Sequence, residues 1–241
     1  MLLSVDNSPL PIAGYSISDI VFPTHGKFRS RKVISRSNSK ATIKYPSWKG
    51  QRMIHCESMH ELNACFLLDF DKSVTHFTEQ PCRVDYINPL GKKLKHYPDF
   101  LVFRENGTQE FWEVKADLAL ESRDVIVRES VLRNLLPNFG YEYFLVCGRS
   151  MTSGARLKNA RYLARNGRVA LEITDFNSSV EFFLPSNILT WDEFAPFINV
   201  GKCNRVLSRL ILEGYVQIDE NKSLSGSSKI WWNSNRNELE V

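Results

Sequence analysis

The sequence predicts an α/β protein with a mixed sheet flanked by helices, followed by a small C-terminal unit of helices and a hairpin. Helical and strand-like segments alternate over 57–167. The stretch 141–147 is apolar on both faces, as in a buried strand. Residues 168–241 change to short helices and a hairpin. With 43% hydrophobic residues, the 241-residue chain can bury a sizeable core, which excludes wholesale disorder.

The first helix is expected over 57–70, where apolar side chains recur at helical spacing. Ser58 is a candidate N-cap, and Glu61 three residues later completes a capping-box pattern. Four segments rich in β-branched or aromatic residues and bounded by turns predict strands. They are Val74–Thr78, Arg83–Ile87, Tyr97–Phe103 and Gln109–Lys115.

A second helix is expected over 122–136, because Pro137 and Gly140 end the helical pattern. Tyr141–Cys147 then predicts the buried strand, and Ala155–Arg165 predicts a third helix. This order of helix, several strands, helix, strand and helix predicts helices on both sides of one mixed sheet.

Residues 168–241 are expected to form a separate small domain. Trp191–Phe197 and Cys203–Glu213 predict short helices, the second ended by Gly214. Gly214–Asp219 and Lys229–Trp232 predict a hairpin, so the order is that of a winged helix-turn-helix. The polar tail 233–241 is a candidate docking peptide.

Positive charge is concentrated before the first predicted helix, in a basic arm over residues 1–56. The formal net charge is only +4, yet residues 20–56 contain no acid. A basic, serine-rich segment suits DNA, whose phosphates reward each cation by counterion release; the alternative is a solvated lead-in segment. The candidate DNA-binding residues are Lys27, Arg29, Arg31, Lys32, Arg36, Lys40 and Lys44.

Three ionisable residues interrupt strands that are otherwise apolar: Asp99, Glu113 and Lys115. Charges at such positions are costly unless they are paired or bound to a cation. Carboxylates are the hard oxygen ligands that Mg²⁺ takes. Lys115 follows Glu113 by two residues, so both side chains leave the strand on one face. There the ammonium can stabilise charge on an attacked phosphate or orient the attacking water.

The connection between the two strands decides whether these groups meet. A three-residue loop, 105–107, pairs Asp99 with Glu113 and puts Gly107 in the left-handed conformation that such a loop requires. A two-residue loop places Asp99 opposite Val114 and turns its carboxylate away. A bulge at Pro98 is a second route to the productive arrangement.

These residues carry a resemblance to a known family. Pro98-Asp99 with Glu113-Val114-Lys115 matches the PD-(D/E)xK nuclease signature. With Glu57-Ser58-x-x-Glu61, Gln80-Pro81 and Arg156-Leu157-x-Asn159, the chain resembles the TnsA family over roughly 25–167. That family comprises the endonuclease subunits of heteromeric, Tn-seven-like transposases.

The resemblance implies a restriction-endonuclease-like fold over 57–167 and a metal-dependent DNA endonuclease. Asp99 and Glu113 would be the main Mg²⁺ ligands, with the Val114 carbonyl and Glu61 completing the site and Mn²⁺ able to substitute. Lys115 would be the catalytic lysine. The subunit would cut the 5′, non-transferred strands at transposon ends, alongside a DDE-type transposase subunit and an AAA+ regulator subunit.

Two alternatives stay open: a free-standing nuclease of restriction or repair type, and a non-catalytic subunit that binds DNA ends. No segment approaches the length of a membrane span, and the first residues lack the features of a signal peptide. The five cysteines are odd in number and form no C-x-x-C pair, which predicts neither zinc nor a disulfide framework. We therefore expect a cytoplasmic protein that acts at the nucleoid.

Overall fold

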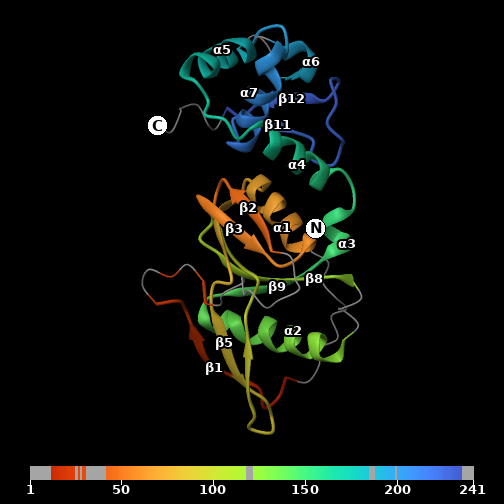
Figure 1. Cartoon of the computed structure of the whole chain (residues 1–241). Helices are drawn as coiled ribbons and strands as arrows, with labels where there is room; N and C mark the ends of the chain where they lie inside the picture. Colours follow the sequence, from red (N-terminus) through yellow and green to blue (C-terminus); the bar gives the residue numbers. More distant parts are fainter. Residues whose placement is uncertain are drawn as a thin grey trace. The chain divides into compact units, whose positions relative to one another are not determined.

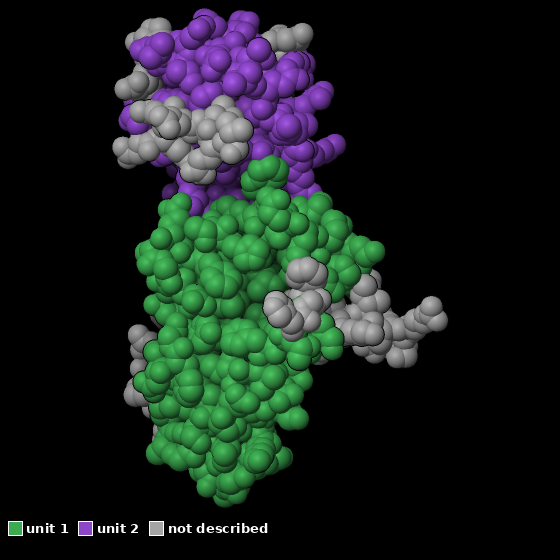
Figure 2. Space-filling view, turned by 90° about the vertical axis from the view of Figure 1, so that its left-hand side faces the viewer, with its two compact units in different colours: residues 1–68, 73–152 green, residues 69–72, 153–241 purple. Residues whose placement is uncertain are grey.

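The structure is a computed structural model with two compact units, shown in Figure 2. The first unit comprises residues 1–68 and 73–152, and the second comprises 69–72 and 153–241. The residues described are 12–24, 27, 29–30, 42–117, 122–184, 188–198 and 200–234. No helix within these ranges is long and apolar enough to cross a lipid bilayer.

A four-stranded sheet forms the centre of the first unit, in the order β4 (Val74–Glu79), β7 (Phe100–Arg104), β8 (Gln109–Lys115) and β9 (Glu142–Cys147). The first two pairings are antiparallel and the third is parallel. The sheet is therefore mixed, as a helical connection between β8 and β9 requires. This arrangement confirms the predicted fold class, a restriction-endonuclease-like mixed sheet flanked by helices.

The hairpin between β7 and β8 has the predicted three-residue loop. Phe100 pairs with Trp112 and Phe103 with Gln109, and the Arg104 N–H donates to the Thr108 carbonyl at 2.9 Å. Gly107 has a φ of +84°, in the left-handed region that the loop demands. Of the alternatives considered for the sequence, the structure thus has the three-residue loop, and Asp99 and Glu113 lie directly beyond Phe100–Trp112, the last regular pair of the ladder.

We expect Gly107→Ala to destabilise the chain by about 1–2 kcal/mol, because an alanine Cβ is disfavoured at this φ. No atom lies within 4 Å of the position a Cβ would occupy, so the cost is conformational and not steric. Gly107→Asn should cost less, since asparagine visits this region more readily. Urea unfolding measures both, and an alanine variant as stable as the wild type would contradict the loop.

Helix α1 (Met59–Phe70) covers one face of the sheet. Its side chains Cys65 and Leu68 are fully buried in one core with Phe77 of β4 and Phe100 of β7. The helix predicted over 57–70 is thus confirmed, starting two residues later. Figure 1 shows α1 and α2 on opposite sides of β8 and β9.

Helix α2 (Arg123–Leu135) and the 3-10 turn η2 (Leu136–Phe139) cover the other face. Leu132 packs there with Leu101 and Phe111, which point away from α1 because successive strand residues alternate in direction. Each face of the sheet therefore has its own apolar core. A short helix, α3 (Gly148–Thr152), follows β9.

The region expected to be a basic arm contributes three strands to the first unit. β1 (Ser16–Val21) pairs with β5 (Arg83–Ile87), which also pairs with β6 (Lys93–His96). β2 (Ile43–Ser47) and β3 (Arg52–Cys56) form a separate hairpin. The predicted strand 83–87 therefore forms, but in a second sheet. The predicted DNA-binding residues Arg31, Lys32, Arg36 and Lys40 lie outside the described residues.

The strand predicted over 97–103 is wrong at its start. Tyr97 and Pro98 separate β6 from β7, and Pro98 has no N–H to give to a ladder. The Asp99 N–H donates to the Trp112 carbonyl at 2.9 Å, which anchors the chain immediately before β7 begins. Because of this break, the Asp99 carboxylate lies outside the regular ladder, directly before the first residue of β7.

The second unit holds the predicted C-terminal elements. They are α4 (Arg156–Asn166), α5 (Ile173–Phe183), α6 (Trp191–Phe194) and α7 (Val200–Leu212), with a sheet of β10 (Ile188–Thr190), β12 (Lys229–Trp232) and β11 (Val216–Ile218). The predicted hairpin is β11 with β12, and Gly214 has the left-handed φ of +83° expected of a helix cap. Helix α5 and strand β10 had no prediction. The winged-helix assignment stays a prediction, and 235–241 of the candidate docking tail lie outside the described residues.

Helix α4 belongs to the second unit, whereas the predicted nuclease domain over 57–167 includes it. Asn159 is buried and binds the loop before β12 through two hydrogen bonds. Its side-chain N–H donates to the Lys222 carbonyl at 2.8 Å, and its side-chain oxygen accepts from the Leu224 N–H at 3.1 Å. Arg156 pairs with Glu220 of the same loop at 3.0 Å. These family-like residues therefore stabilise the second unit.

Candidate active site

One cavity of about 510 Å³ in the first unit is lined by every side chain predicted to act in catalysis. Glu61 comes from α1, Asp99 precedes β7, and Glu113 and Lys115 lie on β8. Val114, whose carbonyl was a predicted ligand, lines it too. Three segments distant in sequence thus converge, while the catalytic and metal-binding roles of their residues stay predictions.

The Asp99 carboxylate is fixed by the neighbouring strand. Its Oδ2 accepts from the Val114 N–H at 2.8 Å, and its own carbonyl accepts from the Gln80 N–H at 2.8 Å. Burial, and next the charge of Glu113, hold the pKa of Asp99 well above its usual range, although Lys115 opposes this shift. A further positive charge near Asp99 would therefore favour the ionised form of its carboxyl group.

Glu113 is surrounded by cationic groups. Its Oε1 lies 2.6 Å from the Lys115 ammonium and 3.5 Å from Nη2 of Arg128, and its Oε2 lies 3.0 Å from Nε2 of His96. Burial raises the pKa of Glu113, but the hydrogen bond from His96 and the charges of His96 and Lys115 bring it to about 2. Glu113 is thus ionised, while the pKa of Asp99 is shifted in the opposite direction.

Lys115 keeps its proton in this environment. Burial lowers the pKa of the ammonium, yet the charges of Glu113 and Asp99 outweigh burial and raise it above its ordinary value. The Lys115 ammonium lies 2.6 Å from the buried Glu113 carboxylate, which holds this positive charge in place at the C-terminal end of β8. Such a group can act on a developing phosphate charge without reorganising.

Glu61 has a double position at the start of α1. Its N–H donates to the Ser58 hydroxyl at 3.1 Å, which confirms the predicted cap. Its carboxylate accepts from the Glu57 N–H at 2.8 Å and from the Ser58 hydroxyl at 3.0 Å. Burial raises the pKa of Glu61. The side chain therefore lines the cavity while its oxygens also stabilise the helix end.

The cavity residues that contact Glu113 include His96 and Arg128, neither of which is among the site residues predicted from the sequence. Both contact Glu113, and His96 also lies 3.5 Å from the Tyr143 hydroxyl. The position of His96 two residues before Pro98-Asp99 was an available signal. Arg128 had none, since only the packing of α2 on the sheet brings it there.

The predicted DNA-binding residues Lys27, Arg29 and Lys44 do not line this cavity. Arg29 instead pairs with Glu79, and Lys44 lies opposite His55 in the β2–β3 hairpin. Within the described residues, no group of three or more His, Cys, Asp and Glu side chains is arranged to hold a metal ion.

The comparison with protein families agrees with this geometry. Residues 71–148 match the family described as TnsA-like endonuclease N terminal, a segment that contains Asp99, Glu113 and Lys115. No curated protein matches the chain. The match supports a nuclease subunit of a transposase in general. Residues 71–148 of this chain are thus similar to the TnsA-like endonuclease N-terminal domain.

Proposed function

We propose that the chain is the metal-dependent endonuclease subunit of a heteromeric transposase and hydrolyses the 5′, non-transferred strands at transposon ends. The observation that carries this proposal is the convergence of Asp99, Glu113 and Lys115 on one cavity inside the matched domain. We further propose that a DDE-type transposase subunit cuts and joins the 3′ ends and that an AAA+ regulator subunit couples both to target choice.

The donor set fits Mg²⁺, with Mn²⁺ as a substitute. Mg²⁺ is usually held by one or two carboxylates and keeps several waters, so it does not need a third acidic side chain. Asp99 and Glu113 would hold it with the Val114 carbonyl, and Glu61 would complete the shell. Burial, and next the charge of Glu113, raise the pKa of Asp99, and a bound cation would favour its ionised form. The bound ion would supply Lewis acidity and a more acidic water.

The chain's own residues would position the phosphodiester. Lys115, fixed by Glu113, presents its ammonium to the phosphate and stabilises negative charge as it develops. Arg128 lines the cavity, and its buried Nε–H has no acceptor within the described residues. A guanidinium in this position suits a phosphate oxygen. Val114 holds the Asp99 carboxylate in place through its N–H.

Metal binding is expected to stabilise the wild-type chain against heat, by about 2.7 kcal/mol at a Mg²⁺ concentration 100 times the Kd. Thermal unfolding with and without Mg²⁺ or Mn²⁺ measures this. Asp99→Asn should lose the increment, while its metal-free form should be at least as stable as the wild type because the repulsion with Glu113 is gone. Asp85→Asn, at a partly exposed pair with Arg83 that does not line the cavity, is the control and should keep the increment. An undiminished increment in Asp99→Asn would reject the ligand assignment.

The partner requirement separates the proposal from a free-standing nuclease. Purified chain should leave plasmid DNA nearly uncut in Mg²⁺, and the DDE-type subunit together with end DNA should restore cleavage. Efficient cutting by the chain alone would favour a restriction- or repair-type nuclease. Residues 170–241, which hold ten acids and six bases, would serve partner docking as readily as DNA contact.

A further inference from the structure

A second hollow of the first unit combines aromatic and cationic side chains. It measures about 420 Å³, and its apolar wall includes Phe22, Leu101 and Phe103. Lys27 and Arg52 supply positive charge, and none of the described lining residues is acidic. We call this site the basic hollow. A ligand that fits it carries a flat apolar group and a negative charge.

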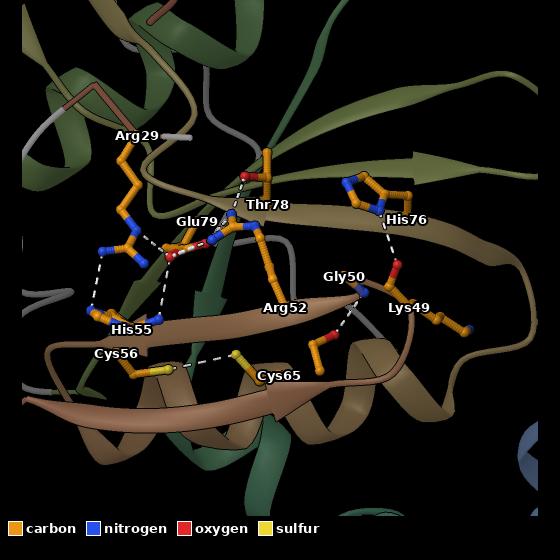
Figure 3. A network of polar contacts seen from close by, with 11 residues as sticks. Arg29, Lys49, Gly50, Arg52, His55, Cys56, Cys65, His76, Thr78 and Glu79 are labelled. Atoms are coloured by element: carbon orange, nitrogen blue, oxygen red, sulfur yellow. Dashed lines mark hydrogen bonds and ion pairs between the residues drawn. The ribbon is translucent and has the colours of Figure 1, made fainter. Parts of the chain in front are cut away.

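Glu79 binds both Arg29 and Arg52, as Figure 3 shows, and Arg52 also lines the basic hollow. Glu79 is 1% exposed, and its Oε1 lies 2.5 Å from Nε of Arg29 and 3.0 Å from Nη1 of Arg52. A second bond joins the other Glu79 oxygen to Arg52, whose Nη2 also donates to the Thr78 hydroxyl at 2.6 Å. One carboxylate thus orients two guanidiniums and neutralises only one.

None of the described residues that line the basic hollow adds a negative charge to the two arginines and Glu79. Nδ1 of His55 accepts from Nη1 of Arg29 at 3.1 Å, and burial followed by the Arg29 charge lowers the pKa of His55. The imidazole is therefore neutral near pH 7 and adds no further charge. Lys44, opposite His55, and Lys27 in the hollow add two exposed cations. Pre-ordered cations of this kind lower the entropic cost of binding an anion.

We propose that the basic hollow binds one nucleotide of a single DNA strand, with its base against Phe22 and Phe103 and its phosphate at Arg52 and Lys27. Phe22 is 43% exposed, so a ring face is available for stacking. A base that stacks there is unpaired, which favours a frayed or single-stranded segment over a duplex. DNA as the ligand rests on the proposed nuclease function.

The basic hollow is close to the candidate active site along the chain. Glu79 pairs with Phe100 across β4 and β7, and the next residue, Gln80, donates its N–H to the Asp99 carbonyl. Gln80 has a left-handed φ of 48°, a conformation that non-glycine residues adopt rarely and mostly near functional sites. A DNA strand bound in the basic hollow would therefore be held beside the backbone segment that contains Asp99.

The test is fluorescence anisotropy with a labelled single-stranded oligonucleotide, in EDTA so that no cleavage occurs. Phe22→Ala should weaken binding about 5- to 100-fold without changing the slope of log affinity against log salt. Lys27→Ala should reduce that slope by about 0.7, the value for one phosphate on a single strand. Phe139→Ala and Lys93→Ala, which change an exposed phenylalanine and an exposed lysine elsewhere, are the matched controls and should bind like the wild type.

Normal oligonucleotide binding by Phe22→Ala would overturn the proposal. If Phe22→Ala and Lys27→Ala both bind the oligonucleotide normally but lose a transposase subunit in a pull-down, the hollow takes an acidic peptide and the proposal is wrong. Cleavage is scored separately with Asp99→Ala, whose oligonucleotide binding should persist. Loss of binding in Phe22→Ala together with active Asp99→Ala would refute the nuclease site and leave the nucleotide site standing.

Discussion

Asp99→Ala and Lys115→Ala are each expected to abolish 5′-strand cleavage in a reconstituted transposition reaction, by at least about 10²- to 10³-fold. Asp99→Ala removes one of two carboxylates available to a metal ion, and Lys115→Ala removes the ammonium 2.6 Å from Glu113. Joining of the 3′ ends belongs to the other subunit in the proposed division of labour. The element should therefore remain attached to the donor DNA at its 5′ ends, which a denaturing gel of the products resolves.

Two controls make this result interpretable. Lys93→Ala removes an exposed lysine of β6 that does not line the cavity, and it should cleave normally. Thermal unfolding should show that Lys115→Ala stays folded, since Glu113 keeps its contacts with His96 and Arg128. Clean excision of the element by both Asp99→Ala and Lys115→Ala would show that other residues cut the DNA.

The largest effect on stability is expected from Glu79→Ala, about 3–5 kcal/mol. The Glu79 side chain is 2% exposed and its two partners, Arg29 and Arg52, are 23% and 18% exposed. Removing the carboxylate leaves two half-buried guanidiniums without their shared counter-charge, and it also removes an acceptor from the His55 N–H at 3.3 Å. Urea unfolding of the full chain gives the loss, and hydrogen exchange of the β3 and β4 amides locates it.

Asp85→Ala provides the comparison, because the Asp85 carboxylate is 21% exposed where that of Glu79 is 2% exposed, and solvated pairs contribute little. Glu79→Gln keeps the shape of the side chain and should fall between the two. If Glu79→Ala unfolds at the same urea concentration as Asp85→Ala, the arginine pair does not depend on the buried charge.

The sheet and the register of its central hairpin were predictable because local signals agreed. Apolar, β-branched runs bounded by turn residues located β4, β5 and β8, and the need for a left-handed residue at Gly107 fixed the loop length. The cap formed by Ser58 and Glu61 was legible for the same reason: its hydrogen bonds join residues three apart. Patterns of this kind need no knowledge of the tertiary structure.

The N-terminal strands were not predictable from composition. β2 and β3 alternate buried residues such as Tyr45 and Ile54 with exposed ones, but the density of lysine, arginine and serine around them resembles a solvated arm. The role of Arg52 was hidden in the same way, because its partner Glu79 is distant in sequence. Contacts of Arg128 and His96 with Glu113 likewise exist only after α2 and β6 have packed.

The three-residue connection between β7 and β8 makes chain length, as well as side-chain identity, a determinant of cutting. Loss of a single codon in this turn would shift β8 by one position and swing Glu113 and Lys115 toward the opposite layer of the molecule, with almost no change in composition. On the proposed function, an element carrying such a deletion would lose cleavage of its 5′ strands, because the cutting groups would no longer face one another across the cavity.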